Sequence, residues 1–160
     1  MFQKRKVPED IFVPHDSSGA SSAGDRVEKR FELNASSEVL SPFRKELRQI
    51  LHETGWEKRA AEEILLAVDE ALTNIIRHAY QGNPGKMTVS VAATDHKIEV
   101  VLEDQGKKFD PTQVQSPELP RHKPDGLGIH FIRTIMDEVV YDHQDPAVNR
   151  LRLIKHKPKI

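Results

Sequence analysis

The 160-residue chain contains no cysteine, which excludes disulfide bonds and thiolate metal sites and fits a reducing cytoplasm. No apolar run is long enough to span a membrane, and none follows the basic first residues Met1–Lys6, so no signal peptide is expected. The formal net charge is only -1, which gives no general reason to expect a nucleic-acid partner. We therefore expect a cytoplasmic protein that binds neither membranes nor nucleic acid.

Two common phosphoryl-transfer signatures are also missing. The chain has no G-x-x-x-x-G-K-[ST] motif of a P-loop, and no H-R-D with D-F-G of the eukaryotic protein-kinase type. Its eight histidines are scattered without the spacing of metal ligands, which argues against a zinc site. Any nucleotide chemistry must therefore use another type of site.

Composition divides the chain into a tail and one domain. Residues 1–29 read as a flexible tail, because Ser17–Gly24 has the composition of a linker and the preceding residues mix prolines with charges. Within this tail, Ile11–Val13 is expected to belong to a frayed end rather than a docked segment. Residues 30–160 are long enough to bury one core.

The apolar pattern predicts helices and strands within the domain. The predicted strands are Phe31–Leu33, Met87–Ala93, Ile98–Leu102, Val139–Tyr141 and Leu151–Leu153. The predicted helices are Ser36–Gly55, Glu57–Ala79 and Gly126–Met136. A loop with four prolines, Pro111–Asp125, precedes the last helix and has the length of a functional lid. This order predicts an α/β fold: a two-layer sandwich with a mixed or antiparallel sheet.

The second predicted helix carries a carboxylate and a carboxamide one turn apart. Glu70 and Asn74 project from the same face, and Arg77 follows on that side, opposite the apolar stripe. Such a face is often a solvated surface, and periodicity alone favours that interpretation. The alternative is a functional pair, in which the carboxamide supplies a metal ligand and the carboxylate a base.

Asp104 follows the predicted strand Ile98–Leu102. It continues the inward alternation from Ile98 to Leu102, so its carboxylate should face the buried side. A buried carboxylate needs hydrogen-bond donors. One interpretation is a cap on the Gln105–Gly106 turn, which is a frequent role for aspartate. The other is an aspartate that binds a ligand.

Gly126–Leu127–Gly128 opens the last predicted helix, where free backbone N–H groups and the helix dipole favour phosphate. A glycine pair before a helix is also common in turns. Four cations lie in the adjoining loop region, namely Lys107, Lys108, Arg121 and Lys123. Each alone is typical of an ordinary surface, and Lys123 is our choice for a phosphate contact.

These three segments, in this order, resemble the asparagine box and the two glycine boxes of the GHKL (Bergerat) fold. That fold is shared by gyrase, a class of heat-shock chaperones, histidine kinases and MutL. More narrowly, Ala67–Tyr80 and Gly126–Val139 resemble anti-sigma-factor serine/threonine kinases of bacterial partner-switching systems. The resemblance runs from roughly Phe31 to His156, and it implies a sheet with its helices on one face.

The resemblance implies how each segment meets ATP and Mg²⁺. Asp104 would accept a hydrogen bond from the exocyclic amine of adenine, Gly106 would let the base approach closely, and Phe109 would pack beside the ring. Those three residues would hold the base.

The phosphate end would use the other two segments. Asn74 would ligate Mg²⁺ that bridges the phosphates, and Glu70 would act as general base. Arg77, Lys123 and the Gly126–Leu127–Gly128 turn would contact the phosphates.

The resemblance also implies a function and partners. The chain would be a serine/threonine protein kinase that phosphorylates a STAS-type anti-anti-sigma antagonist. It would sequester a sigma factor or a similar target, and would form a homodimer. An alternative from another class is an ATP-gated binding regulator with little or no kinase activity, in which Glu70 would be dispensable. A third is an ATPase without a protein substrate, although such hydrolases usually bring a second domain.

One position departs from the family pattern. Members often place a small hydroxyl residue at the start of the last strand, near the base, whereas this chain has Asn149 there. Asn149 would have to replace that contact. A histidine-kinase role does not fit, because the residues upstream leave no room for a dimerisation helix pair with its phospho-acceptor histidine.

Overall fold

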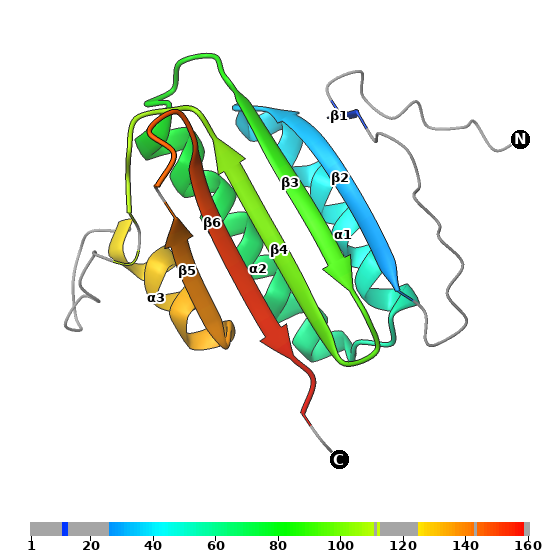
Figure 1. Cartoon of the computed structure of the whole chain (residues 1–160). Coiled ribbons are helices and arrows are strands. Elements are labelled where there is room, and N and C mark those ends of the chain that lie inside the picture. Colours follow the sequence, from blue (N-terminus) through cyan, green and yellow to red (C-terminus); the bar gives the residue numbers. More distant parts are fainter. Residues whose placement is uncertain (1–10, 13–25, 111, 113–124, 143, 159–160) are drawn as a thin grey trace, which may run out of the picture.

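The computed structural model describes residues 11–12, 26–110, 112, 125–142 and 144–158 (Figure 1). Its strands are β1 (Ile11–Phe12), β2 (Val27–Asn34), β3 (Lys86–Ala93), β4 (Lys97–Asp104), β5 (Glu138–Asp142) and β6 (Asn149–His156). Its helices are α1 (Leu40–Glu53), α2 (Lys58–Asn74) and α3 (Asp125–Ile135), with a 3₁₀ turn η1 (Ser37–Val39) and a π-helical turn η2 (Ile75–Ala79). No helix among these residues is long and apolar enough to cross a membrane.

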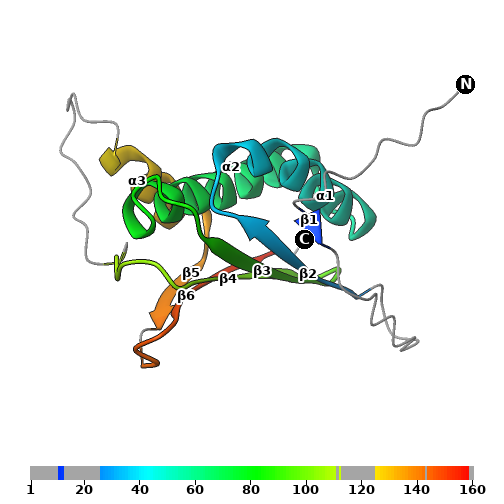
Figure 2. The same cartoon turned by 90° about the horizontal axis from the view of Figure 1, so that it is seen from above.

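The strands form one sheet in the order β1-β2-β3-β4-β6-β5, and every neighbouring pair is antiparallel. The three helices lie on one face of this sheet, and no helix of the described residues covers the other face (Figure 2). The predicted two-layer α/β sandwich is therefore confirmed, with a purely antiparallel sheet rather than a mixed one.

The core lies between the sheet and the helices. In β3 and β4 every second side chain is buried, from Met87 to Ala93 and from Ile98 to Asp104. α2 buries an apolar stripe that includes Ile64 and Leu72, both 0% exposed. Full burial of one such side chain is worth about 1.5–3 kcal/mol. The last inward position of β4 is the carboxylate of Asp104, so a polar group is built into the end of the apolar layer.

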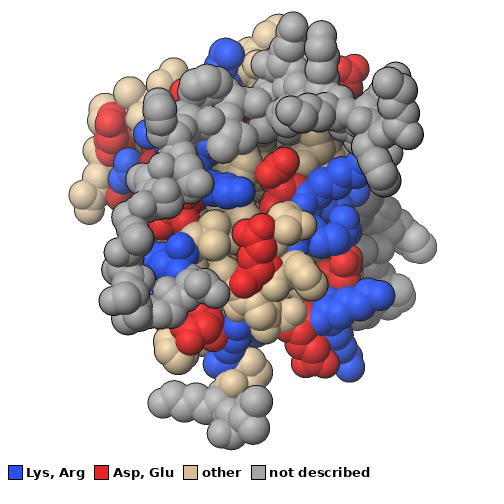
Figure 3. Space-filling view, turned by 90° about the vertical axis from the view of Figure 1, so that its right-hand side faces the viewer, with Lys and Arg blue, Asp and Glu red and all other residues tan. Residues whose placement is uncertain are grey.

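β2 is longer than the sequence pattern indicated. It begins at Val27 and pairs with β3 along its whole length, from Val27 opposite Ala93 to Asn34 opposite Lys86. Lys29 shares the inward side with Val27, Phe31 and Leu33. This charged residue interrupts the apolar alternation and hid the start of the strand. Acidic and basic side chains are interspersed on the described surface of this side of the molecule (Figure 3).

The amino-terminal segment contains one paired stretch. Ile11 and Phe12, expected at a frayed end, form β1 opposite Leu33 and Glu32 of β2. The expected boundary at residue 30 also falls inside β2 rather than before it. The division of the chain into a tail and a domain remains a prediction.

The second predicted helix ends differently from the expectation. Instead of one α-helix to Ala79, the α-helical part stops at Asn74 and a π-helical turn follows. The turn closes with a hydrogen bond from the Tyr80 amide to the Ile75 carbonyl. Gln81 and Gly82 then adopt φ values of 54° and 78° and end the helix. π-helical turns are often found at functional sites.

Candidate functional site

A pocket lies between the end of α2, the π-helical turn and the strand ends of β4, β5 and β6. It is lined by Ala71, Asn74, Ile75, Ala79, Asp104, Phe109, Tyr141, Asn149 and Leu151. Its empty volume is about 350 Å³, including the solvent at its mouth. Sites for small molecules combine apolar walls with a few fixed polar groups. This pocket has that composition.

Asp104 is the buried carboxylate of the pocket. Its side chain is 6% exposed, and its Oδ1 accepts hydrogen bonds from the Gly106 amide at 3.0 Å and from Asn149 Nδ2 at 2.8 Å. Burial raises the pKa of Asp104, while the hydrogen bonds from Asn149 and Gly106 act in the opposite direction. The predicted turn cap is therefore present, and Asp104 lines a pocket as well.

Gly106 allows the chain after β4 to approach the π-helical turn η2. A Cβ atom at this position would lie 2.6 Å from the carbonyl oxygen of Ala79, closer than real contacts allow. The following amide, that of Lys107, donates to the same Ala79 carbonyl at 2.7 Å. The missing side chain thus permits a backbone contact that closes one wall of the pocket.

Phe109 lines the pocket as predicted and has a partner that the sequence did not reveal. Its ring stacks on the His78 imidazole with centroids 4.5 Å apart and planes 20° apart. Because His78 belongs to the π-helical turn, this contact holds the loop after β4 against the end of α2.

Glu70 and Asn74 lie one turn apart on α2, and the surroundings of the two differ. Asn74 is 6% exposed, and its Nδ2 has no hydrogen-bond partner among the described residues. Glu70 is partly buried, and this burial is the main cause of its raised pKa. The neighbouring Asp69 charge raises the pKa further, and the charge of Arg77 lowers it. The polar face of α2 is therefore not a plain solvated surface.

The start of α3 meets Glu70. A Cβ atom on Gly128 would lie 2.4 Å from Glu70 Oε2, so the carboxylate rests where a side chain would otherwise be. Gly126 and Leu127 belong to the first turn of α3, whose amides lack helical partners. Of the two glycine-containing turns, the one with Gly106 therefore lies beside the pocket, and the one with Gly128 lies beside Glu70.

The structure thus brings most of the predicted site residues together. Asn74, Asp104 and Phe109 line one pocket, and Glu70 meets Gly128 above it. Arg77 is exposed on the π-helical turn and close enough for its charge to act on Glu70.

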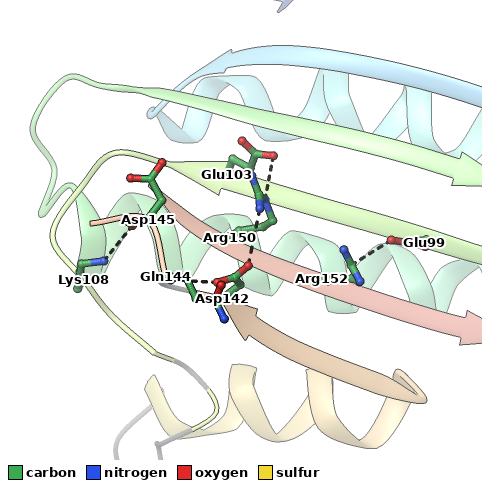
Figure 4. Close-up of polar contacts among 8 residues, drawn as sticks. All are labelled: Glu99, Glu103, Lys108, Asp142, Gln144, Asp145, Arg150 and Arg152. Carbon is green, nitrogen blue, oxygen red and sulfur yellow. Dashed lines mark hydrogen bonds and ion pairs between the residues drawn. The ribbon is translucent and has the colours of Figure 1, made fainter. Parts of the chain in front are cut away.

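The predicted loop cations do not cluster at the pocket in the part of the chain that the structure describes. Lys107 is exposed, and Lys108 Nζ reaches the backbone oxygen of Asp145 at 3.5 Å, in the loop between β5 and β6 (Figure 4). Arg121 and Lys123 lie outside the described residues.

Sequence reasoning missed Tyr141 and undervalued Asn149. Both line the pocket, and the Tyr141 hydroxyl donates to Asn149 Oδ1 at 3.0 Å. A signal was available for Tyr141, because it has the same parity as Val139 in the predicted strand. The partnership of Asn149 with Asp104 depends on strand order, which no local pattern reveals.

These features together are typical of a nucleotide-binding α/β sandwich. They are a pocket with a buried carboxylate, a carboxamide and a carboxylate on the adjoining helix, and the amino terminus of a second helix. The chain belongs to the histidine kinase-like ATPase domain family, whose family model matches residues 33–155. Membership of this family implies that the chain binds ATP. The predicted GHKL fold is confirmed.

Curated relatives narrow the resemblance. The serine-protein kinase RsbW of Staphylococcus epidermidis is 32% identical over 145 residues, which cover 84% of this chain and 90% of that protein. The serine-protein kinase RsbW of Bacillus velezensis is 33% identical over 128 residues, covering 74% of this chain and 79% of that protein. The resemblance to serine/threonine kinases of partner-switching systems is therefore confirmed.

Solved structures share the fold at lower identity. The SiaB-SiaC complex from Pseudomonas aeruginosa gives a TM-score of 0.55 at 16% identity, over 79% of this chain and 89% of that one. The RsbU and RsbW domains of a Mycobacterium tuberculosis protein give a TM-score of 0.55 at 18% identity, over 79% of this chain and 33% of that one. These two likenesses concern the fold alone.

Proposed function

We propose that this chain is an ATP-dependent serine/threonine protein kinase that acts as an anti-sigma factor and phosphorylates a STAS-type antagonist. One observation carries the proposal: the Glu70 carboxylate is held partly buried against Gly128, one turn before the buried Asn74 and beside the pocket that contains Asp104. The serine-protein kinases among its relatives support the same activity.

Adenine would enter the pocket with its amine toward Asp104. The carboxylate accepts hydrogen bonds only, so it suits a base edge that presents a donor. The apolar side chains of Ile75 and Leu151 and the ring of Phe109 would cover the base and exclude water. This arrangement explains why a carboxylate is retained at a buried position.

The phosphates would lie between α2 and the start of α3. Free amides in the turn that contains Gly126, Leu127 and Gly128 favour negative charge. Arg77 adds a cation on the opposite side, and Lys123 remains our choice from the loop. These groups would hold the transferred phosphate in place and stabilise its developing charge.

Mg²⁺ fits the residues present. Asn74 offers a buried carboxamide whose Nδ2 is without a partner among the described residues, so turning the group to present its oxygen to a ligand would break no hydrogen bond of that nitrogen. Mg²⁺ prefers oxygen ligands and retains several waters, so one carboxamide oxygen together with phosphates is a suitable set. When bound, the ion would neutralise phosphate charge.

Glu70 would be the general base. Its raised pKa makes it a better proton acceptor than an ordinary glutamate. It would accept the proton of a serine or threonine hydroxyl as the oxygen attacks the γ-phosphate. The bond between that phosphorus and the bridging oxygen of ADP then breaks, and ADP leaves.

The proposed partners rest on the resemblance to kinases of partner-switching systems. A STAS-type antagonist would supply the hydroxyl, and the unphosphorylated state of that antagonist would compete with a sigma factor or similar target for this chain. A homodimer with two-fold symmetry is the expected assembly. ATP-gated binding without transfer is not favoured, because the relatives are named kinases and Glu70 is held in place.

The test is transfer of labelled γ-phosphate from ATP with Mg²⁺ to a panel of purified STAS domains. We expect label on a serine or threonine of one panel member. Tight ATP binding with no transfer to any member would instead support the gated binding regulator.

A further inference from the structure

Three polar side chains form a continuous chain along the floor of the pocket. Asn149, which is 4% exposed, donates from Nδ2 to Asp104 Oδ1 at 2.8 Å and to the Gly106 carbonyl at 3.1 Å. Its Oδ1 accepts from the Tyr141 hydroxyl at 3.0 Å. Asn149 begins β6 directly opposite Asp104, the last residue of β4, and Tyr141 lies on the neighbouring β5. Three strands therefore contribute one residue each.

The direction of these hydrogen bonds is fixed by chemistry. A carboxylate and a backbone carbonyl only accept, so the amide nitrogen of Asn149 must face Asp104 and Gly106. Its oxygen must then face Tyr141, which makes the tyrosine hydroxyl the donor. Burial raises the pKa of Tyr141, and the charges of Asp104 and Asp110 raise it further, while a hydrogen bond with the backbone of Phe109 lowers it. The net shift is upward, so the hydroxyl keeps its proton. All donors point the same way, toward Asp104, and such chains strengthen one another.

This row of hydrogen-bonded side chains determines what Asp104 presents to a ligand. Oδ1 accepts from both Asn149 and Gly106, whereas Oδ2 accepts none of the hydrogen bonds that the described residues make. A carboxylate held in this way offers an acceptor to the pocket. The exocyclic amine of adenine satisfies it, while the carbonyl of hypoxanthine or guanine at the same position would set oxygen against oxygen.

We infer that Tyr141, acting through Asn149, is a positioning residue that makes the pocket selective for adenine over 6-oxopurines. The inference rests on the proposed function, in which the pocket holds the base of ATP. Without the tyrosine hydroxyl, Asn149 Oδ1 loses this donor, and the amide is held only through Nδ2, by Asp104, Gly106 and Lys107. An amide held at one end can turn and take its donor away from Asp104. The carboxyl can then rotate or take up a proton, and a protonated carboxyl can donate to a 6-oxopurine.

The experiment compares dissociation constants for ATP and ITP, whose bases differ in the amine or carbonyl at this position. Competition with a fluorescent ATP analogue gives both constants for the parent and for Tyr141→Phe, which removes only the hydroxyl. We expect the selectivity for ATP over ITP to fall about tenfold, the ratio that one hydrogen bond contributes. Thermal unfolding of each variant reports on the fold.

Tyr80→Phe is the matched control. The Tyr80 hydroxyl bonds the backbone of Lys86 and Gln105 and makes no contact with Asn149 in the described structure. Its removal should leave the ATP to ITP ratio as in the parent. Asn149→Ala removes the amide that connects Tyr141 to Asp104. Combining it with Tyr141→Phe should give no further loss of selectivity, because both act through one connection.

The outcomes separate the inference from the proposed function. A parent chain that binds no ATP would overturn the proposed function itself. A parent that prefers ATP, beside a Tyr141→Phe variant with the same preference, would overturn only the inference. Equal weakening of ATP and ITP would likewise mean that Tyr141 supports the fold and does not position Asp104.

Discussion

Asp104 and Glu70 are two carboxylates in one site with different surroundings. Asp104 ends an inward-facing row of β4 and receives two hydrogen bonds, whereas Glu70 lies against the backbone of Gly128. Burial raises the pKa of each. The fixed carboxylate suits recognition of a base, and the less constrained one suits proton transfer.

Asp104→Asn should weaken ATP binding strongly without unfolding the chain. The asparagine oxygen can keep both hydrogen bonds to Gly106 and Asn149, while its nitrogen presents a donor to the adenine amine. We expect a rise in the dissociation constant of about ten- to a hundredfold, measured with a fluorescent ATP analogue. Unchanged affinity in the folded variant would contradict the role of Asp104.

The upward shift of the Asp104 pKa predicts how stable the Asp104→Asn variant is relative to the parent. Because the folded state binds this proton more tightly than the unfolded state, ionisation of Asp104 lowers the free energy of unfolding as the pH rises from 3.8 to the folded-state pKa. Asp104→Asn removes this penalty. Its melting temperature at neutral pH should therefore equal or exceed that of the parent.

The transfer rate should depend on the ionisation of Glu70. A base must be deprotonated, so the single-turnover rate at saturating ATP should rise with pH through an inflection above the ordinary value of 4.5. Since the charge of Arg77 lowers this pKa, Arg77→Met should move the inflection to higher pH. An inflection that moved to lower pH in Arg77→Met would contradict this account of the electrostatics.

At the scale of elements, two glycines that look alike in the sequence should respond differently to alanine. At Gly106 the new Cβ would meet the backbone of Ala79 at 2.6 Å, which cannot move cheaply. We expect Gly106→Ala to lower the free energy of unfolding by about 1–3 kcal/mol, as measured by chemical denaturation.

Gly128→Ala should spare the fold and impair transfer. Its Cβ would meet the movable end of Glu70 at 2.4 Å, and alanine is the better helix former. The carboxylate would be displaced, so transfer should fall more than ATP affinity does. A variant that transfers at the parent rate would show that the contact between Gly128 and Glu70 has no role in the reaction.

Local patterns predicted the element types well and their ends less well. Alternation predicted β3 and β4, and helical spacing predicted α1 and the apolar stripe of α2. The length of β2 was missed because the charged Lys29 occupies an inward position and the pairing with β3 determines the extent of the strand. The π-helical turn was missed because a shift from α to π hydrogen bonding leaves no clear apolar signature.

The candidate site was predictable where residues near in sequence act together. Glu70 and Asn74 are spaced by one helical turn, and Asp104 precedes its own turn glycine. The contacts of Asn149 with Asp104, and of Tyr141 with Asn149, join three strands. Such contacts follow from the order β4-β6-β5, in which the last strand of the chain enters between two earlier ones. A single sequence does not reveal that order.

At the scale of the whole molecule, the site and the amino-terminal segment lie at opposite edges of the sheet. β1 lies beside β2, whereas the pocket is built on β4, β6 and β5 (Figure 1). Deletion of residues 1–25 should therefore leave the dissociation constant for ATP unchanged in a fluorescence titration. A large loss of affinity would contradict the division into a tail and an independent nucleotide-binding domain.

Ion pairs join neighbouring strands on the face of the sheet that the described helices do not cover. Arg150 bonds Glu103 at 3.2 Å and approaches Asp142 at 3.7 Å, which links β6 to both neighbours (Figure 4). Arg152 and Glu99 form a similar pair at 3.1 Å. Each such exposed pair contributes little alone, about 0–1 kcal/mol. The fold thus depends mainly on the single core between sheet and helices, which also positions Glu70 and Asn74.

The most direct test of the central claim is a comparison of ATP affinity and phosphoryl transfer in Glu70→Gln. Single-turnover transfer from ATP to the STAS antagonist would be measured beside an ATP titration. The control is Glu63→Gln, which makes the same change at an exposed position of α2. We predict that Glu70→Gln binds ATP like the parent but transfers phosphate about 10²–10⁴ times more slowly, while Glu63→Gln behaves like the parent. Transfer by Glu70→Gln at the parent rate would contradict the assignment of Glu70 as the base and, with it, the proposed mechanism.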